Sequence, residues 1–232
     1  MSALLPVIVA GTSALLLVVF VMRQFTSLPQ LVQFWLGVLP IHGVAFGTCL
    51  VILAANVPSG RRLKALDLLP LPSEPKHFFK VSLGILLVVY PMSILLTYLA
   101  MKGLHWVGYE SPIPPIIDFL AGEPSALTLI SVTVVGVLIA PVAEEVLFRL
   151  VLYECLLRSP LVAPGVVTSM LFALLHETPV QMPALFVLGM VLQYARRRTG
   201  TLWAPIVLHA MYNGASMVFL LLAGTDLPSG PQ

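Results

Sequence analysis

Charged residues are scarce in this chain of 232 residues. They make up 9% of the sequence, and hydrophobic residues make up 59%, with a mean hydropathy of +1.00. A soluble domain carries about 25% charged residues. The shortage of charge excludes an ordinary soluble domain and indicates a polytopic membrane protein, for which we expect membrane lipid and no nucleic acid as partners.

The apolar runs of the sequence contain only two cysteines and no aspartate. The two cysteines, Cys49 and Cys155, both lie within apolar runs, where a small buried side chain is a more common role than a disulfide or a metal ligand. The apolar runs contain no aspartate, which excludes a catalytic aspartate pair inside the membrane. The sequence gives no reason to expect a cofactor or a structural metal.

Long apolar runs predict an all-α transmembrane bundle of about seven spans. We expect these spans at residues 3–22, 31–57, 78–101, 127–157, 161–177, 182–194 and 202–222. This pattern divides the chain into N-terminal helices with an outer loop (1–126), a catalytic helical core (127–222) and a C-terminal tail (223–232).

Basic residues between the spans predict the orientation. With seven spans, nine of them fall on one side of the membrane: Arg61, Arg62, Lys64, Lys76, Lys80, Arg158, Arg196, Arg197 and Arg198. Only Arg23 and Lys102 fall on the other side. Because positive loops stay in the cytoplasm, we expect a cytoplasmic N-terminus.

Two adjacent carboxylates and an arginine interrupt the fourth span. Each charged group at bilayer depth costs about 2.5–3.5 kcal/mol or more, so a functional role is the default interpretation. Glu145 and Arg149 are four residues apart and share a helix face, so we expect them to form an ion pair. Glu144 is turned away from them by about 100° and needs a partner elsewhere. Pro141 removes one backbone hydrogen bond and is expected to leave a free carbonyl beside these residues.

Two later spans carry the polar groups that could meet Glu144. His176 and Glu144 are each sixteen residues from Pro160, so in an antiparallel hairpin they should lie at the same depth. His209 and Asn213 are four residues apart and share a face of the last span. A glutamate beside a histidine can act as a general base on water, and the other two side chains could donate to an oxyanion.

Other interpretations of these residues remain open. The polar groups could form a helix-packing network in a non-enzymatic membrane scaffold or immunity protein. Glu144, His176 and His209 could bind a metal ion, although the second histidine of a zinc-protease motif is missing because residue 180 is valine. A transporter is the third alternative, but the matching Gly- and Pro-broken helices typical of one are not evident.

The ordered motifs resemble a known family. Glu144-Glu145-x-x-x-Arg149, Phe172-x-x-x-His176 and His209-x-x-x-Asn213 are similar to the three-motif signature of the CPBP family, which contains type II CAAX prenyl proteases and bacteriocin-processing (Abi) proteins. The resemblance covers residues 140–216, and no motif residue departs from the pattern.

The resemblance implies a metal-independent glutamic intramembrane endopeptidase with no cofactor. Glu144 and His176 would activate water, His209 and Asn213 would form the oxyanion site, and Glu145, Arg149 and Phe172 would support them. The expected substrate is a peptide or membrane protein, with or without a lipid group. The short loops indicate an integral protein of a prokaryotic inner membrane.

Overall fold

The computed structural model describes residues 75–110, 115–122, 124–157, 163–176 and 178–223, together with the single residues Val32, Trp35, Gly47 and Val51. Within these ranges the regular structure is entirely helical. The helices are α4 (Pro75–Trp106), α5 (Pro115–Ala121), α6 (Ala126–Val134), the π-helix η1 (Val135–Ile139), α7 (Ala140–Glu145), the π-helix η2 (Val146–Leu152), α8 (Tyr153–Leu156), α9 (Pro164–Leu174), α10 (Met182–Thr199) and α11 (Trp203–Ala223). The all-α fold class is therefore confirmed.

Three helical stretches of the described chain are long and apolar enough to cross a membrane. They are Phe78–Trp106, Ala126–Leu156 and Trp203–Leu222. They correspond to the expected spans 78–101, 127–157 and 202–222. The expected spans 3–22 and 31–57 lie outside the described residues, apart from the four single positions. The total of seven spans and the three-part division of the chain stay predictions.

The expected fifth span is shorter than its apolar run. Residues 161–177 were expected to be helical, but α9 contains only 11 residues. At 1.5 Å per residue it is about 17 Å long, well short of the roughly 30 Å hydrocarbon core. Pro164 begins the helix, and the chain turns after Leu174. His176 therefore lies in a turn just beyond the helix.

The outer loop expected at residues 103–125 also contains helix. α4 continues to Trp106, and α5 adds a short helix of 7 residues before α6 begins. Ser125 caps α6, because its side-chain oxygen accepts a hydrogen bond from the backbone N–H of Thr128 at 3.2 Å. α10 extends the expected span 182–194 to Thr199, and Gly200 ends it in the left-handed conformation (φ 71°).

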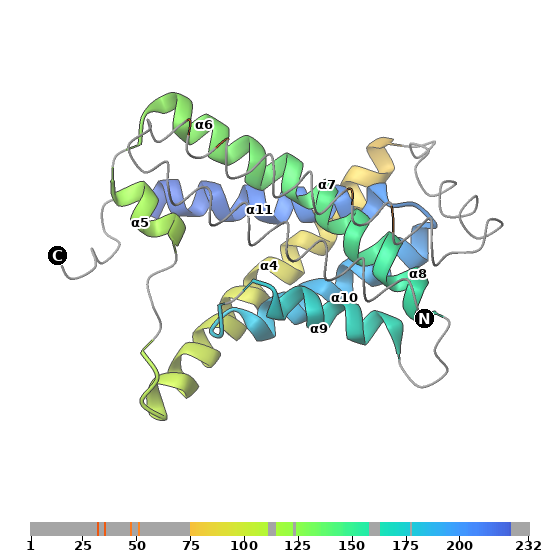
Figure 1. Cartoon of the computed structure of the whole chain (residues 1–232), viewed down its shortest axis with the longest axis horizontal. Coiled ribbons are helices and arrows are strands. Elements are labelled where there is room, and N and C mark those ends of the chain that lie inside the picture. Colours follow the sequence, from red (N-terminus) through yellow and green to blue (C-terminus); the bar gives the residue numbers. More distant parts are fainter. Residues whose placement is uncertain are drawn as a thin grey trace.

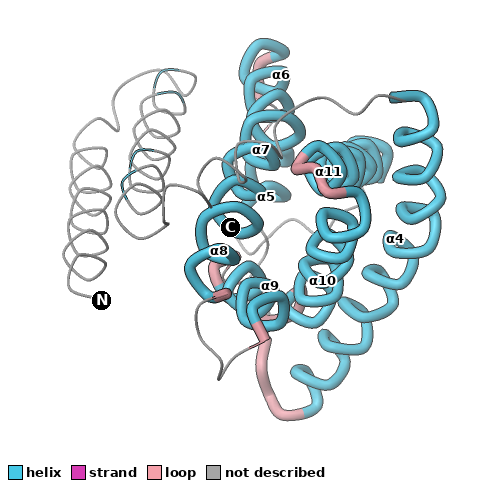
Figure 2. Tube along the Cα trace, turned by 90° about the vertical axis from the view of Figure 1, so that its right-hand side faces the viewer, coloured by secondary structure: helices cyan, strands magenta, loops and turns pink. Residues whose placement is uncertain are grey.

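Two central helices are enclosed by the rest of the bundle. α10 and α11 lie between α4 on one side and the continuous helix α6–α8 on the other, and α9 packs against α10 and η2 (Figures 1 and 2). The apolar core joins Phe148 of η2, Phe172 of α9, Leu188 of α10 and Leu208 of α11.

α9 and α10 approach each other very closely at Gly189. A Cβ atom added to this glycine would lie 2.9 Å from the Ser169 Cβ and 3.0 Å from the Ser169 Cα. Small residues at such a crossing let two helix backbones pack closely inside a membrane. The crossing holds α9 against α10 and therefore fixes the chain that leads to His176.

Candidate active site

Glu145 and Arg149 form a buried ion pair, as their spacing predicts. Arg149 Nε lies 3.1 Å from Glu145 Oε2, and the two side chains are 1% and 0% exposed. Arg149 Nη2 also donates to the carbonyl oxygen of Gly189 at 3.2 Å. The guanidinium therefore connects η2 to α10 at the position where α10 crosses α9.

Glu145 has a second partner that the sequence did not reveal. Its Oε1 lies 2.9 Å from His209 Nδ1, and His209 is 2% exposed. Because a carboxylate only accepts, His209 Nδ1 carries a proton and donates it. One carboxylate of α7 thus holds both the arginine of η2 and the histidine of α11. His209 lies 64 positions from Glu145 and on another helix, so local spacing gave no signal of this contact.

Glu144 points to the other side of α7 and meets both histidines. Its Oε2 lies 4.0 Å from His176 Nε2 and 3.8 Å from His209 Nε2. Among the described residues, this oxygen has no direct hydrogen-bond partner. Glu144 and His176 remain partly accessible, at 29% and 32% exposure. The equal-depth argument is thus confirmed for the proximity of His176 to Glu144.

His176 is oriented by the end of its own helix. Its backbone N–H bonds to the carbonyl of Ala173 at 3.3 Å, which leaves the Phe172 carbonyl without its usual α-helical donor. His176 Nδ1 lies 2.7 Å from that Phe172 oxygen and donates to it, since a carbonyl only accepts. Both histidines therefore use Nδ1–H for a fixed acceptor and direct Nε2 toward Glu144.

Phe172 packs against both imidazoles. The side chain is fully buried, and its ring centroid lies 4.6 Å from that of His176 and 5.5 Å from that of His209. The Arg149 guanidinium carbon lies 4.7 Å from the same ring. This packing limits the rotation of both histidines and excludes water from the far side of the site.

Asn213 is joined to a different part of the fourth span. Its Nδ2 donates to the carbonyl oxygen of Gly136 at 2.8 Å. In η1 the N–H of Ala140 bonds to the carbonyl of Val135, five residues earlier. The next bond of that register would run from Pro141 to Gly136, but proline has no N–H. The expected free carbonyl is therefore that of Gly136, and Asn213 satisfies it.

The described residues contain no group of three or more His, Cys, Asp or Glu arranged to hold a metal ion. Glu144, His176 and His209 converge, but their nitrogen and oxygen atoms face one another across 3.8–4.0 Å. The cluster is rich in acceptors and has one accessible carboxylate. It is suited to moving a proton at one position, the Glu144 Oε2 atom.

One expected loop cation proves to be structural. Arg196 was counted among the basic loop residues, but it is 5% exposed and pairs with Glu154 of α8 at 2.9 Å. Its guanidinium also lies over the ring of Tyr153, 4.7 Å from the centroid. Because this charge is neutralised inside the bundle, it does not support the predicted orientation in the way a free loop cation would.

The segment that carries all these residues matches a family model. Residues 126–215 match the model described as "Type II CAAX prenyl endopeptidase Rce1-like". This segment belongs to the CPBP family. The match extends from the first residue of α6 into α11 and includes Glu144, His176, His209 and Asn213. No curated protein and no solved structure matches the chain significantly.

The family match of residues 126–215 and the three apolar helices support a coarse assignment. The protein is an integral membrane protein, and at the family level it is a CAAX-type intramembrane protease that acts on a peptide or protein at the membrane. Residues 1–125 and 216–232 lie outside the match.

Proposed function

We propose that this CPBP-family protein is a metal-independent glutamic endopeptidase in which Glu144 activates the attacking water. The observation that supports this most strongly is the convergence of two imidazole Nε2 atoms on one carboxylate oxygen, at 3.8 and 4.0 Å. These separations are too long for direct hydrogen bonds. They suit a water molecule that hydrogen bonds to the carboxylate and to an imidazole.

The hydrogen-bond directions at the site favour water as the reactant. With its Nδ1–H already donated to the Phe172 carbonyl, a neutral His176 offers Nε2 as an acceptor. Two acceptors, His176 Nε2 and Glu144 Oε2, then face one position. Water supplies the two protons that such a site needs, and its lone pairs stay free to attack a carbonyl carbon.

His209 differs from His176 in its fixed partner. His176 donates Nδ1–H to a neutral carbonyl, whereas His209 donates to the Glu145 carboxylate. A carboxylate stabilises an imidazolium and fixes its orientation, as in a catalytic triad. If His209 is doubly protonated, it and Arg149 balance the charges of Glu144 and Glu145, and its Nε2–H can donate to an oxyanion.

The reaction follows from these assignments. Glu144 takes one proton from water while the water oxygen bonds to the peptide carbonyl carbon and the carbonyl electrons move to oxygen. His209 Nε2–H stabilises that oxyanion, together with the second N–H of the Asn213 amide, whose first N–H is donated to Gly136. When the C–N bond breaks, the proton passes to the amine through Glu144 and His176, and the products are an acid and an amine.

The supporting residues act on position and charge. Glu145 holds His209, Arg149 holds α10, and Phe172 packs against both imidazoles. We further propose a cytoplasmic N-terminus in a prokaryotic inner membrane, supported by the excess of basic residues between the expected spans. The substrate would be a membrane-bound peptide or protein, and the test below asks whether it carries a prenyl group.

The test compares Glu144→Gln with a matched control, Glu110→Gln. Purified protein in detergent would be assayed on a fluorogenic peptide with a CAAX-type end, prenylated and unprenylated, with thermal unfolding measured in parallel. Glu144→Gln keeps the side-chain volume but cannot accept a proton, so the rate should fall by about 10²–10⁴ while the melting temperature stays unchanged. The exposed Glu110 should tolerate the same change.

Chelation separates this mechanism from the metal alternative. EDTA should leave the cleavage rate unchanged, and loss of activity that zinc restores would favour a metal bound by Glu144, His176 and His209. Full activity of Glu144→Gln would exclude this residue as the base. A native protein that cleaves neither peptide, together with a destabilised Glu144→Gln variant, would favour a polar network that only joins helices.

A further inference from the structure

A cavity lies away from the cluster of Glu144, His176 and His209, where the beginning of α9 meets the last two turns of α10. It has a volume of about 560 Å³, and its lining includes Gly165, Gln193, Tyr194, Arg197 and Arg198. α8, α9 and α10 lie side by side in this part of the molecule (Figures 1 and 2). His176 is at the opposite end of α9, so the cavity is separate from the proposed active site.

Gln193 is the unusual residue of this cavity. Its side chain is 3% exposed, yet within the described chain neither its Nε2 nor its Oε1 has a hydrogen-bond partner. The side chain packs closely on Gly165, where an added Cβ would lie 3.2 Å from the Gln193 Cγ. Leaving a buried amide unsatisfied is costly, and such groups normally have a partner. The amide thus offers one donor group and one acceptor to a ligand in the cavity.

The charges around Gln193 favour an anion. Arg197 and Arg198 line the cavity, and its described lining contains no carboxylate. The nearest acid on α8, Glu154, is already paired with Arg196 at 2.9 Å. α9 begins here without a side-chain cap, so the positive end of its dipole also faces this region.

We propose that this cavity binds a phosphate group. Arg197 and Arg198 would neutralise the phosphate, and the Gln193 NH₂ would donate to one of its oxygens. The Gln193 Oε1 needs a donor, which a hydroxyl group next to the phosphate would supply. A hydroxylated phospholipid headgroup, such as phosphoglycerol, meets both needs.

The edge of the cavity is consistent with a lipid. Tyr194 and Val166 line it and are 62% and 42% exposed, and Met190 adds a further apolar side chain. Aromatic residues of this kind are enriched where a protein meets lipid headgroups. Basic cavities between membrane helices bind anionic headgroups by the same combination of charge and apolar contact.

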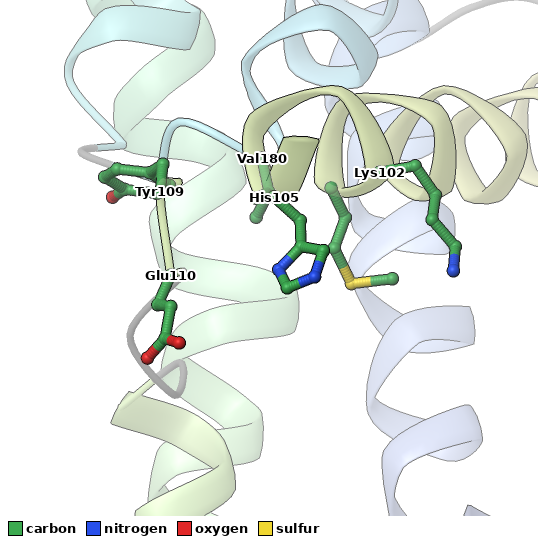
Figure 3. A pocket seen from close by; sticks show the side chains of 6 residues that line it. Lys102, His105, Tyr109, Glu110 and Val180 are labelled. Atoms are coloured by element: carbon green, nitrogen blue, oxygen red, sulfur yellow. The ribbon is translucent and has the colours of Figure 1, made fainter. Parts of the chain in front are cut away.

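A second cavity provides the control. It is lined by Met101, Lys102, His105, Tyr109, Glu110 and Val180 and has a volume of about 340 Å³ (Figure 3). Lys102 and Glu110 extend on opposite sides of His105, so this cavity holds both a cation and a carboxylate. Lys102→Gln removes a positive charge from the protein without touching the proposed phosphate site.

The experiment measures the thermal stability of the full chain, purified in detergent, against three additives. Short-chain phosphatidylglycerol should raise the melting temperature because a ligand that binds the folded state stabilises it. Inorganic phosphate tests the anion alone, and short-chain phosphatidylcholine tests a headgroup that is neutral overall and lacks the hydroxyl. We expect phosphatidylglycerol to act at the lowest concentration and phosphatidylcholine not to act above its detergent-like background.

Two variants test the site itself. Arg197→Gln with Arg198→Gln should raise the half-maximal phosphatidylglycerol concentration by about tenfold or more, since it removes two charge-assisted hydrogen-bond donors. Gln193→Leu removes the buried amide, so the unliganded protein should keep or gain stability while its response to phosphatidylglycerol weakens. Lys102→Gln should respond as the unchanged protein does.

Each outcome has a definite meaning. Equal responses to phosphate and phosphatidylglycerol would keep the phosphate site and assign it to the free ion. A response to phosphatidylglycerol that is unchanged in Gln193→Leu and in the double arginine variant would overturn the proposal, as would the absence of any response to both phosphate compounds. Because binding is measured without cleavage, this result is independent of the proposed protease mechanism.

Discussion

Gly189→Ala tests whether the crossing of α9 and α10 controls the active site. The added Cβ would lie 2.9 Å from the Ser169 Cβ, about 0.5 Å short of the 3.4 Å at which ordinary contact begins, and the Ser169 backbone lies at 3.0 Å. The two helices must therefore move apart. Overpacking of this kind costs about 1–3 kcal/mol, and the better helix propensity of alanine offsets roughly 0.5–1 kcal/mol of that cost.

The expected loss of stability in Gly189→Ala is thus small, up to about 2.5 kcal/mol, but the loss of activity should be larger. The carbonyl of Gly189 accepts the Arg149 hydrogen bond at 3.2 Å, and α9 leads directly to His176. A displacement of about 1 Å at a catalytic group can reduce the rate by about 10²-fold. The cleavage rate and the thermal unfolding of the same preparation would separate the two effects.

Gly84→Ala is the matched control for this prediction. Gly84 lies within α4, and a Cβ added there meets no atom within 4 Å. The control should be as stable as the native protein or more so, and equally active. Ser169→Gly should restore part of the activity of Gly189→Ala, because it removes the Cβ at 2.9 Å and leaves only the backbone contact. Full activity of Gly189→Ala, or an equal loss in Gly84→Ala, would refute the reasoning.

Two further predictions concern the buried contacts of the fourth span. Arg149→Ala leaves the Glu145 charge without its arginine partner, so the free energy of unfolding should fall by about 3–5 kcal/mol. Denaturation in detergent would measure this change. An unchanged stability would mean that the pair contributes nothing. Asn213→Ala should cost about 1–3 kcal/mol because the Gly136 carbonyl loses its donor, and it should cost less in a Pro141→Ala background, where residue 141 regains an N–H. A double-mutant cycle without coupling between these two positions would contradict the π-helical register.

Contacts within one helix or one hairpin could be predicted from the sequence. The four-residue spacing gave the Glu145–Arg149 pair, and equal distances from Pro160 placed His176 beside Glu144. The bounds of α11 also agree closely with the apolar run at 202–222. In each case a regular helix converts sequence separation directly into distance.

Contacts between distant helices could not be predicted in this way. The bond from Glu145 to His209 joins residues 64 positions apart, and it depends on how α7 and α11 are rotated against each other. The burial of Arg196 depends on Glu154, 42 positions earlier. The sequence marked Pro141 as a lost donor, but only the π-helical register of η1 identifies Gly136 as the carbonyl left free.

Because of the two π-helical segments, the direction in which the glutamates of the fourth span point depends on the number of residues in those segments. η1 and η2 lie directly before and after the six residues of α7, which carry both glutamates. A π-helical turn holds one residue more than the corresponding α-helical turn. Deleting one residue from Val135–Ile139 could keep the segment helical, but it would rotate the glutamates by about 100° relative to α6. A related chain with an unbroken α-helix here would present the glutamates on the same face with one residue fewer between them and the Gly136 position. Sequence alignments of such chains should therefore allow a single-residue gap at this point.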